Sequence, residues 1–174
     1  MGLKRFGVRV IGAAAAILVA LLALVAPAQA QGVSGTVSVI TLRPLSILKM
    51  GDLDFGTLVS TPTAGTVSVD PVDDGRTTTG GVIAGGGAPR AARFLSYGTA
   101  GSILYVTRGQ LPTLTRSGGG GSMPVTALTL NGPVLRVVNP AGVLDLRVGA
   151  TMSVGANQAA GVYTGSFDIN VNYY

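Results

Sequence analysis

The C-terminal segment AAGVYTGSFDINVNYY alternates between hydrophobic and polar side chains. Its hydrophobic positions are Tyr163, Phe167, Ile169, Val171 and Tyr173, and the positions between them include Ser166, Asp168, Asn170 and Asn172. A repeat of two residues is typical of a β-strand with one buried face. Chain ends fray unless pairing or packing holds them, so we expect residues 162–173 to form one strand docked on the rest of the fold.

The segment GVSGTVSVITL, near the other end, alternates in the same way. Val33, Gly35, Val37 and Val39 fall on one face, whereas Ser34, Thr36 and Ser38 fall on the other. Pro44 then interrupts the run, since proline cannot donate to a strand ladder. This strand has two alternative partners: its own sheet, or the sheet of another copy.

Between these two ends, short hydrophobic runs are separated by glycine and proline, and no helical period is sustained. The further predicted strands are residues 53–58, 66–70, 93–97, 102–107, 125–130, 134–138, 144–148 and 151–154, with 33–42 and 162–173 at the ends. Residues 77–90 and 155–161 are predicted to be loops, and SGGGGS at 117–122 is predicted to be a long hairpin loop. About ten short strands indicate an all-β sandwich or barrel.

The first 30 residues have the features of a secretory signal peptide. A basic start with Lys4, Arg5 and Arg9 precedes the apolar run of residues 10–25, and the small residues Ala28 and Ala30 follow it. The run is shorter than the roughly 20 residues that a membrane-spanning helix needs. We therefore expect cleavage after Ala30, export, and no integral membrane span in the mature chain, residues 31–174, which is predicted to be a single domain.

The amino-acid composition excludes several kinds of binding and catalytic site. The chain has 12 Lys and Arg, three of them in the signal segment, against seven acidic residues that are all Asp. The basic residues are scattered without an aromatic platform, so nucleic acid is not an expected partner. His, Cys and Trp are absent, which removes catalytic triads, ordinary zinc sites and disulfides. We predict no cofactor and no enzymatic activity.

Two groups of aspartates are candidates for catalysis or for metal binding. Asp52 and Asp54 lie two residues apart and would share a face of a strand, about 6–7 Å from each other. That separation would allow an acid pair for glycoside hydrolysis, but no other polar cluster accompanies them, so catalysis is not expected. The turn of residues 70–75, DPVDDG, carries Asp70, Asp73 and Asp74. It lacks the spacing and the closing Glu of a helix-loop-helix calcium site, so a solvated turn is predicted, with a weak cation site as the alternative.

Several motifs resemble a known family. They are PLSI at 44–47, LDFGTL at 53–58, VGATMSV at 148–154 and AGVYTGSFDINVNY at 160–173. The sequence resembles a bacterial pilin-like domain of unknown function that is associated with the major subunits of Mat/Ecp fimbriae. It is more distantly similar to the spore coat U domain. It differs from spore coat U relatives because it has no cysteine pair, and SGGGGS looks like an insertion.

This resemblance implies an immunoglobulin-like (pilin-like) antiparallel β-sandwich that lacks one strand. A periplasmic chaperone and an outer-membrane usher would assemble such subunits into a fimbrium at the cell surface. The N-terminal strand, with Val33, Gly35, Val37 and Val39, would fill the gap in a neighbouring copy, and the C-terminal strand would border that gap. The alternative is a monomeric exported module that binds a polysaccharide or another surface ligand.

Overall fold

The computed structural model describes residues 38–174, and within them it contains 13 strands and no helix. Every strand lies in Thr41–Tyr174, which form one compact unit. All strand pairs are antiparallel. The prediction of an all-β antiparallel sandwich is therefore confirmed.

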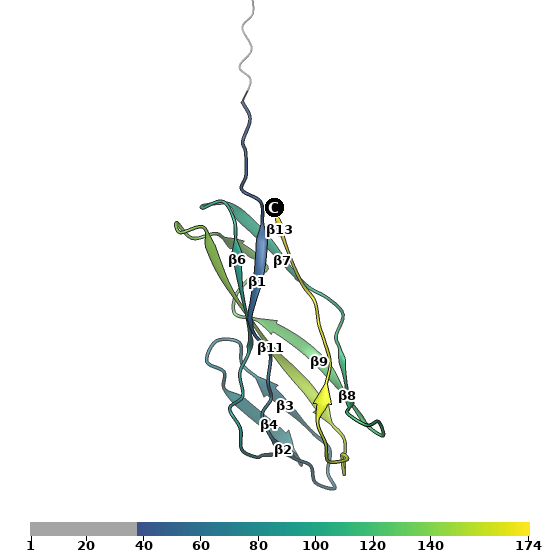
Figure 1. Cartoon of the computed structure of the whole chain (residues 1–174). Helices are drawn as coiled ribbons and strands as arrows, with labels where there is room; N and C mark the ends of the chain where they lie inside the picture. Colours follow the sequence, from purple (N-terminus) through teal and green to yellow (C-terminus); the bar gives the residue numbers. More distant parts are fainter. Residues whose placement is uncertain (1–37) are drawn as a thin grey trace, which may run out of the picture. The chain divides into compact units, whose positions relative to one another are not determined.

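The larger sheet has eight strands, of which six follow the order β1-β6-β11-β9-β8-β12. Two further strands extend it, since β3 pairs with β11 and β4 pairs with β3. The bounds are β1 Ser46–Gly51, β3 Gly65–Val69, β4 Arg76–Gly80, β6 Ala92–Tyr97, β8 Thr113–Arg116, β9 Ser122–Leu130, β11 Val143–Val154 and β12 Tyr163–Thr164. Figure 1 shows β1 lying beside β6.

The second sheet has three strands in the order β10-β7-β13. Their bounds are β10 Leu135–Val137, β7 Ile103–Arg108 and β13 Ile169–Tyr173. A two-stranded ribbon joins β2 Leu58–Val59 to β5 Ile83–Ala84. The chain therefore ends in an edge strand of the smaller sheet.

Strand β11 connects the parts of the larger sheet. It is 12 residues long, and two other strands pair with it along one edge. Its first half pairs with β6 and its second half with β3, while β9 pairs along the opposite edge. Gly149 lies where the neighbour changes. A Cβ atom there would lie 2.2 Å from the Val69 carbonyl oxygen and 2.9 Å from the Pro71 nitrogen. Glycine is required at this position because the backbone of the chain leaving β3 passes directly over it.

The core follows from strand alternation. On the inward face of the β3, β9 and β11 group, Val67, Leu128 and Met152 are among the buried residues of one hydrophobic cluster. Leu104 of β7 and Leu146 of β11 are also completely buried. Apolar residues at every second position thus exclude water from the inner faces of both sheets, which is the main stabilising contribution to such a fold.

A guanidinium group holds two loops at one end of the larger sheet. Arg76, the first residue of β4, donates to the carbonyl oxygens of Phe55 at 2.9 Å, Gly85 at 2.8 Å and Thr57 at 3.1 Å. Gly56 has a φ of 72°, and a Cβ atom there would lie 2.5 Å from the Arg76 Nη1 atom. The segments before β2 and after β5 are therefore packed around one positive charge.

Most of the internal strands agree with the sequence prediction. The predicted strands at 66–70, 93–97, 102–107, 125–130 and 134–138 correspond to β3, β6, β7, β9 and β10. The predicted hairpin loop SGGGGS is confirmed, because it joins β8 to β9 and these two strands pair. Gly118, Gly119 and Gly120 in this loop have positive φ angles, which glycine adopts without strain.

Other predictions were wrong. The segments 144–148 and 151–154 are one continuous strand, β11. The predicted strand 53–58 is mostly irregular and contains only the isolated bridge between Asp54 and Arg90, before β2 begins at Leu58. The predicted loop 77–90 contains most of β4 and all of β5. Strands β1 and β8 were missed, and residues 38–42 of the predicted first strand are not in a strand.

The single closing strand predicted for 162–173 is also wrong, because the segment forms β12 and β13 in different sheets. It runs antiparallel to β8 and then to β7, and it breaks where those two strands are separated by residues 109–112. At the break, a Cβ atom on Gly165 would lie 3.2 Å from the Thr113 carbonyl oxygen. Gly165 therefore lies against the backbone of β8, at the point where the segment passes from the larger sheet to the three-stranded sheet.

Candidate functional site

Strand β13 pairs only with β7, so its other edge has no strand partner within the described residues. The Gly109 amide donates to the Asp168 carbonyl at 2.8 Å, and the Tyr174 amide donates to the Ile103 carbonyl at 3.0 Å. Backbone groups of successive residues point to opposite edges in an antiparallel ladder. Asn170 and Asn172 therefore face β7. The intervening residues, Ile169, Val171 and Tyr173, direct their backbone groups towards the unpaired edge.

The side chains of β13 alternate as the sequence predicts. Ile169, Val171 and Tyr173 are half-buried, whereas Asn170 and Asn172 are exposed. Ile169 packs against the main hydrophobic cluster. The residues with free backbone groups are thus the ones whose hydrophobic side chains point inward. We call this row of three residues the β13 edge.

Strand β1 is the edge of the larger sheet, and it pairs only with β6. Its hydrophobic residues Ile47, Leu48 and Met50 are 44%, 53% and 53% exposed. The register shifts between Lys49 and Gly51, as at a β-bulge. An exposed apolar edge strand is prone to pair with another chain. Among the edge strands of the described residues, β1 therefore has an unpaired side together with exposed apolar side chains.

The Tyr173 hydroxyl connects the end of β13 to the segment that enters β1. It donates to the Arg43 carbonyl at 2.8 Å and accepts from the Thr99 amide at 2.8 Å. A Cβ atom on Gly98 would lie 3.0 Å from this hydroxyl oxygen, so the tyrosine lies against the backbone. The end of β13 and the start of β1 are consequently close together (Figure 1).

An aromatic pair connects the two sheets at the other end of β13. Phe167, just before the strand, meets Phe94 of β6 edge to face, with ring centroids 6.3 Å apart and an interplanar angle of 83°. Such a geometry is favourable for aromatic rings. Both ends of β13 are therefore fixed against the larger sheet, although its outer backbone edge remains unpaired.

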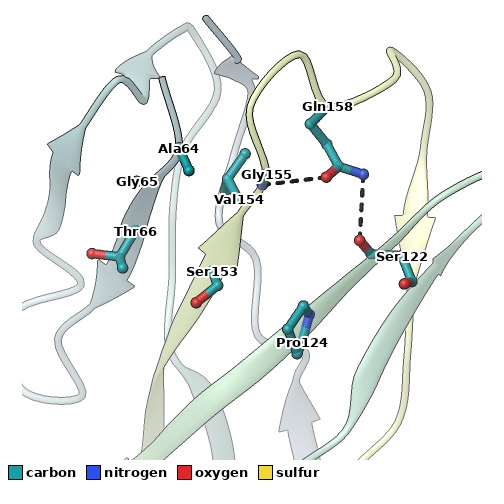
Figure 2. A pocket seen from close by; sticks show the side chains of 9 residues that line it. All are labelled: Ala64, Gly65, Thr66, Ser122, Pro124, Ser153, Val154, Gly155 and Gln158. Carbon is teal, nitrogen blue, oxygen red and sulfur yellow. Dashed lines mark hydrogen bonds between the residues drawn. The ribbon is translucent and has the colours of Figure 1, made fainter. Parts of the chain in front are cut away.

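A shallow depression of about 500 Å3 lies elsewhere, on the larger sheet. It is lined by residues near the ends of three strands, including Gly65, Ser122 and Val154, and by Gln158 from a loop. Figure 2 shows the Gln158 side chain over this depression, with its amide oxygen near the Gly155 amide and its nitrogen near the Ser122 carbonyl. The sequence analysis did not predict this depression, since its lining residues are far apart along the chain.

Comparison with protein families matches residues 45–173 to a family described as a domain of unknown function, DUF4402. The chain belongs to this family. The match includes every strand from β1 to β13, so the β13 edge and strand β1 both lie within the DUF4402 domain. Comparisons with curated proteins and with solved structures found no match.

The structure brings together only part of the predicted C-terminal site. Ile169, Val171 and Tyr173 share one face of β13, and Phe167 lies just before them. Tyr163 is on β12, and its hydroxyl donates to the Ala159 carbonyl at 2.7 Å. Tyr163 therefore does not share a strand with the residues of β13, although it packs against the same hydrophobic cluster as Phe167 and Ile169.

The predicted donor strand lies mostly outside the described residues of this DUF4402 chain. Val33, Gly35 and Val37 are outside them, as are the cleavage residues Ala28 and Ala30. Val39 is described and is 84% exposed, but it is not in a strand. Strand donation and cleavage therefore remain predictions. In residues 38–174 no helix is long and apolar enough to cross a membrane.

The candidate acid pair consists of two aspartates with separate contacts. The Lys49 Nζ atom donates to Asp52 at 2.8 Å, and this hydrogen bond lowers the pKa of Asp52. The Asp54 carboxylate accepts from the Gly56 amide at 2.8 Å and lies 3.9 Å from the Arg90 Nη2 atom. A general acid at neutral pH needs a raised pKa, so the arrangement at Asp52 resembles a surface ion pair.

The second group of aspartates shapes the turn between β3 and β4. Asp70 accepts from the Val72 amide at 2.7 Å, and Asp73 accepts from the Gly75 amide at 2.8 Å. Asp74 instead accepts from the Ala91 amide at 2.7 Å and from Arg147. Within residues 38–174, no group of three or more acidic, His or Cys side chains could hold a metal ion.

Replacing Asp74 by asparagine is expected to weaken the pH dependence of stability. The hydrogen bond from the Ala91 amide lowers the pKa of Asp74, burial opposes this shift, and Arg147 adds to it. A carboxyl with a lowered folded-state pKa stabilises the fold above its unfolded pKa of about 3.9. That contribution is lost as the pH falls through the lower folded-state value. The Asp74→Asn variant should therefore be less stable at pH 7 and approach the wild type below pH 4.

Urea unfolding between pH 2 and 7 measures this effect. Asp168→Asn is the control, because Asp168 is exposed and its carboxylate makes no hydrogen bond within the described residues. The control should follow the wild-type pH profile. Parallel profiles for Asp74→Asn and the wild type would contradict the expected role of the Asp74 carboxylate.

Proposed function

We propose that this protein is an exported structural subunit of a fimbria or a related surface assembly, in which the N-terminal strand of one copy pairs with the next copy. The observation that carries the proposal is the β13 edge. It offers free backbone groups at Ile169, Val171 and Tyr173, beside inward-facing hydrophobic side chains. Strand addition at such an edge uses backbone hydrogen bonds for affinity and alternate side chains for register.

The exposed edge strand β1 supports the same function. Strand β1 carries exposed Ile47 and Leu48 and lies in the other sheet. The two edges approach each other where Tyr173 binds the Arg43 carbonyl. A strand added along β13 would cover hydrophobic surface that soluble monomers normally protect.

The sequence of the proposed donor fits this role. Val33, Val37 and Val39 would face inward at alternate positions, next to the side chains of the β13 edge. Gly35 would be accommodated where the backbone of the acceptor comes closest, because glycine has no side chain. Ser34, Thr36 and Ser38 would face solvent.

The partners proposed for this function are further copies of the same chain, a periplasmic chaperone and an outer-membrane usher. The chaperone would pair with the β13 edge until another subunit replaces it, because an unpaired apolar edge aggregates. Similarity to Mat/Ecp major subunits and to the spore coat U domain belongs to this proposal. After cleavage at Ala30, the protein would pass through the periplasm to the cell surface.

Disulfide trapping between copies tests the proposal. The chain has no cysteine, so each variant can carry a single introduced thiol. Copies with Val37→Cys and mass-tagged copies with Val171→Cys are produced in the same cells and oxidised. A disulfide requires Cα atoms about 4.4–6.8 Å apart. We expect mixed dimers to form with either Val171→Cys or Ile169→Cys as the acceptor.

The matched control is Val137→Cys on β10, at the opposite edge of the same sheet. It is 62% exposed, so its thiol is accessible, but it should give few mixed dimers with Val37→Cys. The double variant Val37→Cys/Val171→Cys should form bonds between copies. A bond within one copy, with no mixed dimers in any combination, would mean that the N-terminal strand completes its own sheet.

A further inference from the structure

The outward face of β4, β3 and β11 carries hydroxyl groups in a regular arrangement. The six residues, which we call the hydroxyl array, are Thr77 and Thr79 on β4, Thr66 and Ser68 on β3, and Thr151 and Ser153 on β11. Thr66 is paired with Thr79 on one side and Ser153 on the other. Ser68 is likewise paired with Thr77 and Thr151.

These pairings place the hydroxyl groups in two rows of three. Neighbouring strands are about 4.7–4.9 Å apart, and residues two positions apart along a strand are separated by about 6.6–6.8 Å. The residues between the array positions, including Val67 and Met152, are buried on the inner face. The hydroxyl-bearing side chains therefore point away from the core, and each of them is exposed or half-exposed.

Most of these hydroxyl groups are available to a ligand. Thr66 and Thr79 share a hydrogen bond with an oxygen–oxygen distance of 2.6 Å. Across the described part of the chain, no hydrogen bond uses the hydroxyl groups of Ser68, Thr77, Thr151 or Ser153. The array itself contains no ionisable side chain. It is thus a neutral surface that can both donate and accept hydrogen bonds.

The depression described above continues from one row of the array. Thr66 and Ser153 line it, together with Pro124 and Gln158. Figure 2 shows Thr66 and Ser153 on adjacent strands, with Pro124 and Gln158 on the far side of Ser153. The Gln158 amide is held by a hydrogen bond to the Tyr163 hydroxyl at 2.8 Å. The surface therefore combines a row of hydroxyl groups, an apolar ring and a fixed amide.

From this arrangement we propose that the hydroxyl array and the adjoining depression bind a neutral polysaccharide. Sugar hydroxyl groups would exchange hydrogen bonds with the array, and Pro124 would contact the apolar face of a sugar ring. The depression is shallow and open, with a volume of about 500 Å3, so it would contact one side of a sugar ring without enclosing it. Because adjacent strands are rotated by about 20–25°, the array suits a flexible chain better than a flat crystalline lattice.

This site is separate from the β13 edge and does not depend on strand donation. Neither β1 nor β13 contributes a residue to the array. A single neutral site of this kind would bind weakly, since each hydrogen bond replaces one to water. Repetition of the site along a polymer of subunits would strengthen attachment to the polysaccharide through multivalency.

Two binding assays on the mature protein test the proposal. Affinity electrophoresis uses a native gel that contains soluble mixed-linkage β-glucan or dextran. A pull-down uses microcrystalline cellulose. At least one of these neutral glucans should retain the wild type. Thr151→Val/Ser153→Ala removes two hydroxyl groups and keeps the shape of the surface nearly unchanged. Loss of two hydrogen bonds should weaken retention about tenfold. Thr107→Val, at a half-buried threonine of β7, is the matched control and should bind like the wild type.

Several results would overturn the proposal. One is that none of the three neutral glucans retains the wild type, and another is that the array variant is retained as strongly as the wild type. The others are retention by anionic alginate alone and inhibition of ice growth without glucan binding. Thermal unfolding of both variants checks that the fold is intact. The array variant should still give Val37→Cys/Val171→Cys mixed dimers. Failure of glucan binding is thereby distinguished from failure of strand donation.

Discussion

Lysine in place of Val37 is expected to abolish polymers while leaving a folded subunit that its chaperone can bind. In the proposed assembly, Val37 faces inward beside the hydrophobic side chains of the β13 edge. An ammonium group there would lose its hydration without gaining a partner, which costs several kcal/mol. The measurement is electrophoresis of surface-extracted protein before and after boiling in detergent. The wild type should give a ladder that collapses only on heating, and Val37→Lys should give monomer under both conditions.

Ser38→Lys is the control for this experiment, because Ser38 lies at the next position and would face solvent. It introduces the same charge into the same segment, and it should retain the ladder. Fibres of normal length from Val37→Lys would refute strand donation. Loss of fibres in both variants would show that charge anywhere in the segment blocks export or assembly. The alternation of inward-facing and outward-facing residues in the donor strand would then have no support.

Truncation of Leu146 to alanine is expected to have the largest effect on stability. Leu146 is completely buried on β11 and is paired with Phe94 of β6. Replacing a buried leucine by alanine costs about 2–5 kcal/mol because a cavity remains. Domains of this size are stable by about 5–15 kcal/mol. The unfolding midpoint should fall by roughly 10 °C, as measured by circular dichroism during heating.

Val137→Ala provides the comparison, since Val137 is a hydrophobic strand residue that is mostly exposed. Its removal should change the free energy of unfolding by less than about 0.5 kcal/mol. Similar losses in both variants would mean that the inner faces of the sheets are not closely packed at Leu146. The contrast therefore tests the position of the core directly.

Alternation predicted the strands that have one inner and one outer face. In β3, Val67 and Val69 are buried and alternate with Thr66 and Ser68, so the hydrophobic and polar positions in the sequence correspond to the inner and outer faces of the strand. The same pattern continues without a break through β11, where the alternate residues from Leu146 to Val154 are buried, although the sequence prediction divided this strand in two. Gly149 lies at an outward position between them, and the reason for a glycine there is the approach of Val69 and Pro71 from another part of the chain.

Strands β1 and β4 were harder to predict because their sequences do not alternate between hydrophobic and polar residues. Strand β1 is exposed along nearly its whole length, so its sequence shows no alternation. Strand β4 contains Thr77, Thr78 and Thr79, and its stabilising contacts come from pairing with β3 and from Arg76. The pairing of β1 with β6 and of β4 with β3 is through the backbone, so it leaves no alternation in the sequences of β1 and β4.

The candidate site was predictable only in part. Ile169, Val171 and Tyr173 were identified by alternation, and they do share a face of β13. The displacement of Tyr163 depends on where β7 ends and β8 begins, which its own segment does not encode. The hydroxyl array depends on the register of three strands, although Thr-x-Thr or Thr-x-Ser occurs in each of them. A search for this repeated tripeptide would have indicated the array.

The contacts of Arg76 have a consequence for the conditions under which this end of the molecule keeps its shape. Loops that are fastened by a bound metal ion loosen when a chelator removes the ion. Here the loops at Phe55 and Gly85 are instead held by hydrogen bonds from a side chain of the protein itself. This end of the molecule should therefore keep its shape in the presence of a chelator.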